Sequence, residues 1–216
     1  VMEQMGRHLV CAPYFSTVCQ AVPALQLAAT GEQASPWLER ILGGATATLG
    51  WIGYEAPGCD AVTATFQTTA QGYRLSGDYQ LVVDGHSAEI LVLAARVPGS
   101  AGRDGISLFV VDAEGIQRHW TPTLDQTRHL GRIQLNQLEL PADACLGEAG
   151  QAGAVLEQVL QLATVALAAE QVGAAQQVQD LAVQYTKERE QFGRPIAGFQ
   201  AIKHKAADMM LRTEVA

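Results

Sequence analysis

The sequence has few of the features that mark nucleic-acid-binding or membrane-spanning proteins. Charged residues make up 17% of its 216 residues, acidic side chains outnumber basic ones by 22 to 14, and no basic residue occurs between Arg132 and Lys187. Phosphate binding by a nucleic-acid partner needs clustered lysine and arginine, so we expect no such partner. Uninterrupted apolar runs such as residues 90–95 are far shorter than the roughly 18 residues of a membrane span, so we expect none.

Cysteine is also scarce, and there is no sign of a secretory leader. The cysteines form no CxxC pair and have no metal-ligand spacing, which favours buried free thiols in a reducing compartment. No basic stretch followed by an apolar core opens the chain. We therefore expect a cytoplasmic protein without a metal site. The four cysteines are Cys11, Cys19, Cys59 and Cys145.

What the sequence does contain is enough apolar material, 48% of residues, to bury a core. The chain begins at Val1 within a helical pattern and stops at Ala216 within another, with no Gly, Asn or Pro to end that helix. We therefore expect an internal piece of a longer protein.

The first predicted region, residues 1–45, reads as helical. The segment 20–29 is rich in Ala and Leu, and Ser35 followed by Pro36 is a suitable cap and first-turn pair for a helix that continues to Leu42. Glycines at positions 43 and 44 then break the pattern.

The second region, residues 46–150, alternates with a period of two. From Val62 to Thr69 apolar residues alternate with polar ones, which is the pattern of a strand with one wet face. Further strands are predicted at 73–75 and 79–83, after the turns at 70–72 and 77–78, and at 90–97, 106–111 and 133–140. Because Gly-rich turns and no helices join these strands, we predict an antiparallel β-barrel or sandwich.

The third region, residues 151–216, is helical again. Apolar residues between 152 and 190 form two neighbouring stripes, so this helix should pack on several sides, as in a bundle. It would span about 55 Å, and Gly173 in the second stripe would let another helix approach closely. The turn at 192–195 ends it, and a new helix follows from Ile196. The predicted fold class is therefore α+β and multidomain: a helical segment, an antiparallel β-barrel or sandwich, and the start of a four-helix bundle.

The segment 185–209, YTKEREQFGRPIAGFQAIKHKAADM, resembles the signature of the acyl-CoA dehydrogenase family almost continuously. In that family it forms the turn between the first two helices of the C-terminal bundle. The preceding AAEQVGAAQ at 168–176 is similar to the first bundle helix, and LELPADACLGE at 138–148 is similar to the exit from the β-domain. The order of helices, β-domain and long helices agrees with the family architecture, so the resemblance covers essentially the whole chain.

The resemblance implies a role for the turn in binding FAD. A guanidinium offers a fixed fork of donors that matches phosphate oxygens. In the family, the residues that match Arg189 and Gln200 contact an FAD held mainly by a partner subunit, and Gln191 and Phe192 would line the turn. The alternative for Arg189 is a surface salt bridge to a nearby carboxylate (Glu188, Glu190 or Asp208), with Phe192 in the bundle core. His204 we expect to be structural.

The β-domain departs from the family pattern in two places. The loop that wraps the flavin, Thr-Glu-Pro-Gly-Ala-Gly-Ser-Asp in typical members, is similar to a shortened stretch at 54–60, where Cys59 replaces the hydroxyl ahead of Asp60. The family's Trp-Ile-Thr strand beside the isoalloxazine falls on residues 81–83, Leu-Val-Val. Trp51 could supply an aromatic surface instead, although core packing is its expected role.

No residue qualifies as the catalytic base. Removing the α-proton of an acyl-CoA requires a carboxylate opposite the flavin. Family members place this glutamate at one of two positions. The first corresponds to Ala163, and Thr164 beside it corresponds to an arginine of some members; the second position lies beyond Ala216. Glu170 is two turns along the helix, and we expect it to be structural.

Two functions remain open at this point. The first is an FAD-dependent acyl-CoA dehydrogenase, which desaturates an acyl-CoA thioester and passes electrons to an acceptor such as an electron-transfer flavoprotein. The second is a non-catalytic partner subunit that contributes FAD contacts across an interface. A flavin monooxygenase or acyl-CoA oxidase is a third use of the same fold. In each case we expect a homo- or hetero-oligomer, either a dimer or a tetramer.

Overall fold

The computed structural model describes residues 1–54 and 56–216 and divides the chain into two compact units. We call residues 11–164 the β-unit, and residues 1–10 together with 165–216 the helical unit. The long helix α4 (Gly153–Glu188) contributes to both. Each unit is described by itself below. The division into 1–45, 46–150 and 151–216 remains a prediction.

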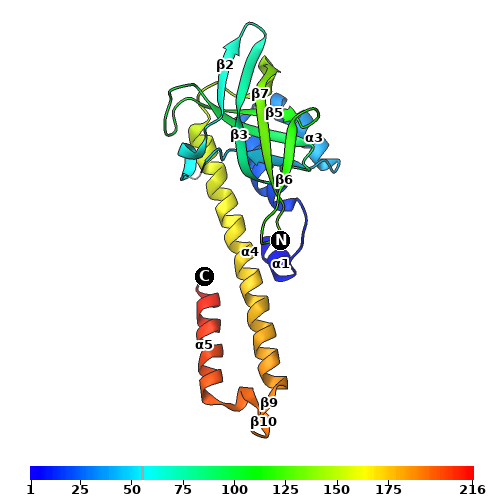
Figure 1. Ribbon diagram of the computed structural model, residues 1–216, viewed down its shortest axis with the longest axis vertical. Helices are drawn as coiled ribbons and strands as arrows, with labels where there is room; N and C mark the ends of the chain where they lie inside the picture. Colours follow the sequence, from blue (N-terminus) through cyan, green and yellow to red (C-terminus); the bar gives the residue numbers. More distant parts are fainter. Residues whose placement is uncertain (55) are drawn as a thin grey trace. The chain divides into compact units, whose positions relative to one another are not determined.

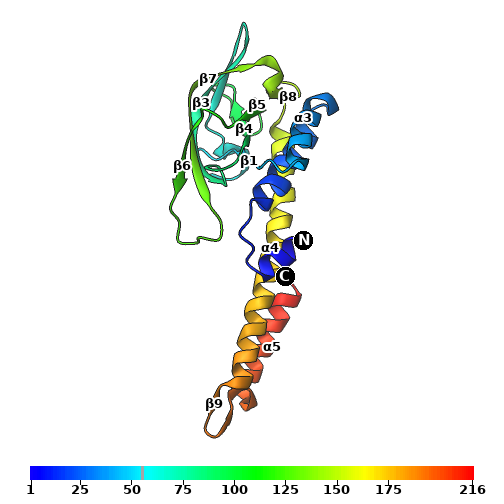
Figure 2. The same cartoon turned by 90° about the vertical axis from the view of Figure 1, so that its right-hand side faces the viewer.

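The β-unit is built on an eight-stranded sheet in the order β6-β7-β3-β2-β4-β5-β8, with β1 paired to β4 beside this path (Figures 1 and 2). The strands are β1 (Ala47–Gly50), β2 (Thr65–Thr69), β3 (Gly72–Val83), β4 (Ile90–Arg96), β5 (Ile106–Asp112), β6 (Gln117–Thr121), β7 (Leu130–Pro141) and β8 (Cys145–Leu146). Two 3-10 turns, η2 (Gly58–Ala61) and η3 (Ala142–Ala144), complete it.

Two apolar cores lie on opposite faces of β4. Alternate residues Ile90, Val92 and Ala94 pack with the helices that precede β1 and with the first turns of α4. The residues between them, Leu91 and Leu93 among them, pack with side chains of β2, β3 and β7. The sheet therefore folds over on itself, and Figure 2 shows β3 and β7 facing β4 and β5. Burial on both faces explains why β4 reads as a continuous apolar run.

The α+β class is confirmed, but the prediction of an antiparallel barrel or sandwich is wrong in detail. The sheet is mixed, because β1 runs parallel to β4, from Ala47 beside Ile90, and β2 meets β4 in parallel at Thr65 and Arg96. It does not close into a barrel. Three strands of this sheet were not predicted from the sequence. β1 and β8 are only four and two residues long, and β6 is polar and largely exposed.

The helices before β1 contain an unusual π-helical turn. They are η1 (Phe15–Ala21), α2 (Val22–Ala28) and α3 (Gly31–Leu42). Pro23 follows η1 and lacks an N–H, so it cannot donate the hydrogen bond of a regular α-helix to the carbonyl one turn earlier. Short π-helical turns are frequent at functional sites.

The predicted start of α3 is wrong by one turn. The helix begins at Gly31 with Thr30 as its cap, and Pro36 lies inside it. Thr30 and Gln33 form a capping box, in which each side chain accepts a hydrogen bond from the other residue's backbone N–H. Ser35 donates to the Gly31 carbonyl instead of capping the helix.

The helical unit contains α1 (Met2–Arg7), most of α4 and α5 (Gln200–Glu214). Between α4 and α5 lie a two-stranded hairpin, β9 (Glu190–Gln191) and β10 (Arg194–Pro195), and a 3-10 turn, η4 (Ile196–Gly198). In both views α5 runs back beside the C-terminal part of α4 (Figures 1 and 2). Large apolar side chains remain exposed on both helices: Val165, Val178, Leu181, Tyr185, Met210 and Leu211.

Glycines bring α1 and α4 into backbone contact, as the second stripe predicts. A Cβ atom on Gly173 would collide with the carbonyl of Glu3, and one on Gly6 would collide with the carbonyl of Glu170. An ion pair between Arg7 and Asp180, 2.7 Å apart, adds to this packing. The two glycines therefore set the distance between the helices.

By length and composition alone, α4 is also able to cross a membrane. An 18-residue window of it has a mean hydropathy of 1.2, and 22% of that window is buried. Core helices of soluble proteins have the same character, so this property alone does not place α4 in a bilayer.

We predict that Gly173→Ala lowers the free energy of unfolding by about 1–3 kcal/mol, because the added methyl group forces α1 away from α4. Urea denaturation followed by circular dichroism at 222 nm measures the change. Gly31→Ala is the matched control: no atom lies within 4 Å of its added methyl group, so we expect no destabilisation. Equal effects of the two substitutions would contradict the packing role of Gly173.

Candidate functional site

The turn between α4 and α5 carries the predicted cofactor-binding residues on a strained hairpin. Gln191 pairs with Arg194, and the two residues between them have positive φ, 53° at Phe192 and 72° at Gly193. Two positive φ values are those of a type I′ turn, which glycine adopts readily and phenylalanine does not. Phe192 is also 93% exposed. A strained and exposed aromatic residue is typical of a binding surface.

Arg189 lies just after α4, and its side chain is exposed. The alternative of a salt bridge is not observed, because Arg189 forms none within residues 1–54 and 56–216. Glu188 instead accepts a hydrogen bond from Gln184, 2.6 Å away. The Arg189 backbone is fixed by two hydrogen bonds, to Tyr185 and from Ile196. The backbone of Arg189 is thus fixed, and its exposed guanidinium is available to an anion.

The other predicted residues of this site are exposed as well. The side-chain amide of Gln191 donates to the carbonyl of Glu190 at 2.7 Å. Gln200 lies at the start of α5, with its Nε2 atom 3.4 Å from Nε2 of His204. Phe192 contacts Phe199 edge to face, and Arg194 stacks on Phe199. The structure thus brings the four predicted residues into one turn, and their contact with a cofactor remains a prediction.

The same turn concentrates positive charge in an acidic chain. Residues 187–205 contain five basic and two acidic side chains, whereas the whole chain carries a net charge of −8. All three lysines of the protein lie here: Lys187, Lys203 and Lys205. This local excess suits a ligand with a diphosphate group.

In the β-unit, a buried arginine fixes the end of the predicted flavin loop. Arg96 is only 7% exposed, and its guanidinium donates to the carbonyls of Cys59 and Val62, both at 2.7 Å. It also donates to the carbonyls of Ser100 and Gly102. Sequence analysis missed this role because an arginine at the end of a strand has no distinguishing pattern.

Cys59 stands where the family loop has a hydroxyl, and it is turned inward. Its thiol is buried and donates to the carbonyl of Gly153 at 3.5 Å. The pKa of this thiol is raised mainly by burial, and the nearby negative charge of Glu157 raises it further. It therefore stays protonated at neutral pH and serves packing. Glu55, which precedes it in the loop, lies outside the described residues.

A cavity of about 90 Å³ lies beside the 81–83 stretch. Leu81 has a φ of +55° and is 50% exposed, so it offers an aliphatic surface where the family has an aromatic one. Trp51 both packs on the core and lines the cavity, which unites the two roles considered for it. The lining residues are Gln20, Leu49, Trp51, Ile52, Gln80, Leu81, Val82 and Val83.

Hydrogen bonds hold the π-turn η1 against this cavity. The Thr17 hydroxyl accepts from the backbone N–H of Ala47 and donates to the carbonyl of the same residue, both at 3.0 Å. Ser16 donates to the carboxylate of Asp84 at 2.6 Å. These bonds fix the position of Gln20, which sequence analysis did not single out although it is a lone amide in an apolar run.

The position on α4 that matches one family site of the base is apolar and buried. Ala163 is 5% exposed, and Thr164 donates back to the carbonyl of Leu160 within α4. Glu170 belongs to the helical unit, where its backbone meets Gly6. That this part of the chain contains no catalytic residue remains a prediction.

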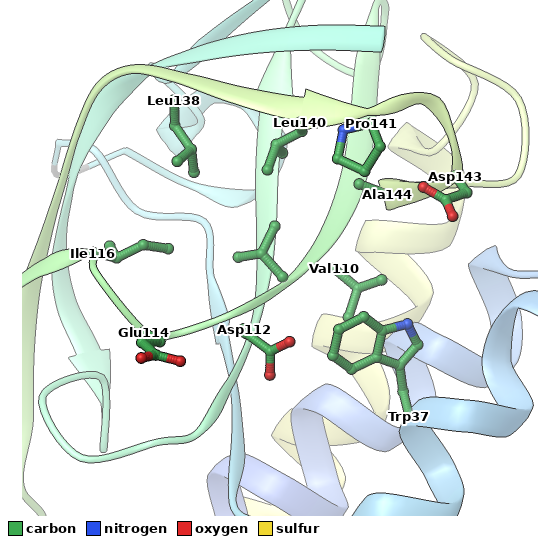
Figure 3. Close-up of a pocket in the computed structure, with 11 residues that line it drawn as sticks. Trp37, Val110, Asp112, Glu114, Ile116, Leu138, Leu140, Pro141, Asp143 and Ala144 are labelled. Atoms are coloured by element: carbon green, nitrogen blue, oxygen red, sulfur yellow. The ribbon is translucent and has the colours of Figure 1, made fainter. Parts of the chain in front are cut away.

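A larger pocket of about 370 Å³ lies between α3 and the ends of β5 and β7 (Figure 3). Its floor is apolar, with Trp37 at one side, and its rim carries Asp112, Glu114 and Asp143. Arg40 pairs with Asp112 at 2.6 Å and lies over Trp37. An acidic rim repels the phosphates of a dinucleotide or of coenzyme A, so we do not assign this pocket to either.

We predict that Arg96→Met lowers the free energy of unfolding by about 2–4 kcal/mol, because several backbone carbonyls lose a charged donor. Chemical denaturation measures the loss. Arg132→Met removes an exposed arginine paired with Asp78, and should cost less than about 1 kcal/mol. A cost for Arg96→Met as small as that for Arg132→Met would show that the guanidinium does not hold the loop.

Comparisons with known proteins identify the relatives of this chain. The family model of the acyl-CoA dehydrogenase C-terminal domain matches residues 148–216. A cyclohex-1-ene-1-carbonyl-CoA dehydrogenase of Geobacter metallireducens is 30% identical over 230 residues, which cover 99% of this chain and 58% of that protein.

Solved structures agree in fold. The butyryl-CoA dehydrogenase of Megasphaera elsdenii superimposes with a TM-score of 0.91 at 24% identity, covering 99% of this chain and 58% of that one. A structure described as PigA with FAD and proline gives a TM-score of 0.83 at 24% identity, with 93% and 54% covered.

The chain spans about half the length of the curated relatives it matches, from 35% to 58% of them. The match runs through the helices, the sheet and the α4–α5 turn alike. The chain belongs to the acyl-CoA dehydrogenase family.

Proposed function

We propose that this protein is an FAD-dependent acyl-CoA dehydrogenase that desaturates an acyl-CoA thioester between its α- and β-carbons. The observation that carries the proposal is the guanidinium of Arg189, exposed and free of salt bridges among the described residues, within the family's turn. FAD, when bound, would accept the hydride from the β-carbon at its flavin N5 atom.

The residues present suit FAD at its diphosphate end. Arg189 offers a fork of charged donors that matches phosphate oxygens, and the basic turn around it lowers the cost of bringing in two negative charges. Gln200 and Gln191 add amide donors, and the exposed Phe192 adds an apolar contact. We propose that these residues bind the cofactor of a neighbouring subunit.

Towards the flavin ring the fit is less complete. Leu81 replaces the aromatic residue and Val83 the hydroxyl of the family's strand, so this chain offers apolar contact there in place of stacking and a hydrogen bond. We propose that the loop after Trp51 contributes backbone donors, with Arg96 holding its far end.

A non-catalytic partner subunit is the second candidate, favoured by two observations. Leu81 and Val83 stand where the family's strand has an aromatic residue and a hydroxyl. The buried Ala163 stands at the position on α4 where some family members have the catalytic glutamate. Such a subunit would lend Arg189 and Gln200 to a neighbour's FAD and perform no chemistry itself.

The partners we propose follow from the same account. The exposed apolar side chains of α4 and α5 need a cover, because burying them removes apolar surface from water. Further bundle helices and an adjoining subunit would supply it in a dimer or tetramer. We further propose an electron-transfer flavoprotein as acceptor and a cytoplasmic location.

We predict that Arg189→Gln weakens FAD binding by about 10- to 100-fold, since a charged hydrogen bond contributes roughly 1.5–3 kcal/mol. The protein should be purified as its gene encodes it, and its FAD dissociation constant measured from flavin absorbance and fluorescence. Arg212→Gln, on the exposed side of α5, is the matched control and should leave the constant unchanged.

The outcomes separate the candidates. Bound FAD together with reduction of the flavin by acyl-CoA supports the dehydrogenase, and bound FAD that no acyl-CoA reduces supports the partner subunit. A protein that binds no FAD, alone or with a partner subunit, would contradict both.

A further inference from the structure

We propose that the pocket between α3 and the ends of β5 and β7 binds a small organic cation, namely a protonated amine or a guanidinium attached to an apolar body. This is the cavity of about 370 Å³ in Figure 3. Among the described residues that line it, none belongs to the 54–60 loop, to residues 81–83 or to the α4–α5 turn. The inference therefore goes beyond the proposed function and does not depend on it.

The pocket lies where the two apolar cores of the β-unit meet. Val110 and Val111, neighbours on β5, belong to different cores, and both line the pocket. Trp37 packs against the first core and Leu138 and Leu140 against the second, and each of these three side chains is only partly buried. The volume is within the roughly 300–1,000 Å³ of small-molecule sites. A ligand with an apolar body would therefore complete the packing between the cores.

The rim of the pocket adds negative charge. Asp112 and Glu114 flank the buried Ala113 at the end of β5, and Figure 3 shows their carboxylates side by side, while Asp143 comes from η3. Arg40 balances Asp112. Glu114 and Asp143 form no ion pair or hydrogen bond within the described part of the chain. Because exposed carboxylates are ionised at neutral pH, a cation in the pocket would meet two unpaired negative charges.

Arg40 shows which kind of group this rim accepts. Its guanidinium lies 5.1 Å from the centre of the Trp37 ring and 2.6 Å from the Asp112 carboxylate. An organic cation thus already lies against both an aromatic ring and a carboxylate, and the two contacts are each attractive. Glu114 and Asp143 offer carboxylates to a second such cation, and the apolar floor offers contact to the body that carries it.

Other classes of ligand fit this pocket less well. The described residues contain no group of three His, Cys, Asp or Glu placed to hold a metal ion, so the rim carboxylates do not form a metal centre. An anionic ligand would be repelled by the same carboxylates. An uncharged apolar ligand would gain nothing from them.

The test compares two probes of the same length, 3-phenylpropylamine and 3-phenylpropan-1-ol, which differ by an ammonium group in place of a hydroxyl. Dissociation constants are measured by isothermal titration calorimetry at low ionic strength, with the protein as its gene encodes it. We expect the amine to bind about three- to tenfold more tightly, since each exposed charge pair contributes modestly. At about 0.5 M salt the preference should shrink, because such pairs are screened.

A double variant tests the role of the rim. Glu114→Gln combined with Asp143→Asn removes both unpaired charges at exposed positions and keeps the size of the side chains. It should bind the two probes equally. Asp104→Asn combined with Glu214→Gln is the matched control, because it removes the same charge from exposed positions outside the pocket. The control should retain the preference for the amine.

Tryptophan fluorescence locates the bound probe. Trp37 lines the pocket, whereas Trp120 lies on the exposed strand β6. The change in emission caused by the amine should disappear in Trp37→Phe, which keeps an aromatic ring and should still bind the amine in the calorimeter. It should persist in Trp120→Phe.

Several results would overturn the inference. Equal affinity of the wild type for the two probes, or a preference that survives in the rim double variant, shows that the rim does not select a cation. A preference lost equally in the control double variant shows an effect of overall charge only. A fluorescence change that remains in Trp37→Phe locates the probe elsewhere. Binding of neither probe, as expected if another segment of the protein or a second subunit covers the pocket, also overturns it and leaves the flavoprotein assignment intact.

Discussion

Burial of β4 and β5 on both faces is the constraint on which the rest of the β-unit depends. Because neither face of these strands meets water, the helices before β1 and the first turns of α4 must cover one side, and the folded-over part of the sheet must cover the other. That arrangement leaves the edges and loops for binding. Residues 59–62 and the π-turn η1 are tied to the sheet by the buried Arg96 and Thr17.

Arg189 is exposed and carries a charge without a salt-bridge partner among the described residues. Three other side chains, Gln20, His86 and Gln179, bury a polar atom without a hydrogen-bond partner among these residues. Phe192 adds a backbone conformation that its side chain disfavours. Departures from local consistency are expected at functional sites, where the ligand completes the interaction. Arg189 and Phe192 thus suit a binding surface, whereas Arg96 and Cys59 serve the fold.

The sequence was sufficient to predict the long helix, its close approach by another helix at Gly173 and five of the strands within a few residues. These features follow from periodicity, which local residues determine. The parallel pairing of β1, the folding of the sheet and the strand β6 could not be predicted, because they depend on contacts distant in sequence. The start of α3 was misjudged because Ser35-Pro36 and Thr30 are both plausible caps, and only the reciprocal bonds of Gln33 select Thr30.

For the site, the family motif in the sequence located Arg189, Gln191, Phe192 and Gln200, whereas the exposure and backbone conformation of these residues depend on the folded turn. The most direct measurement of the central claim is a crystal structure of the protein with FAD bound. The account predicts the Arg189 guanidinium at about 2.7–3.1 Å from a diphosphate oxygen of an FAD held by the neighbouring subunit. An Arg189 side chain that contacts no phosphate, while FAD is bound elsewhere, would contradict it.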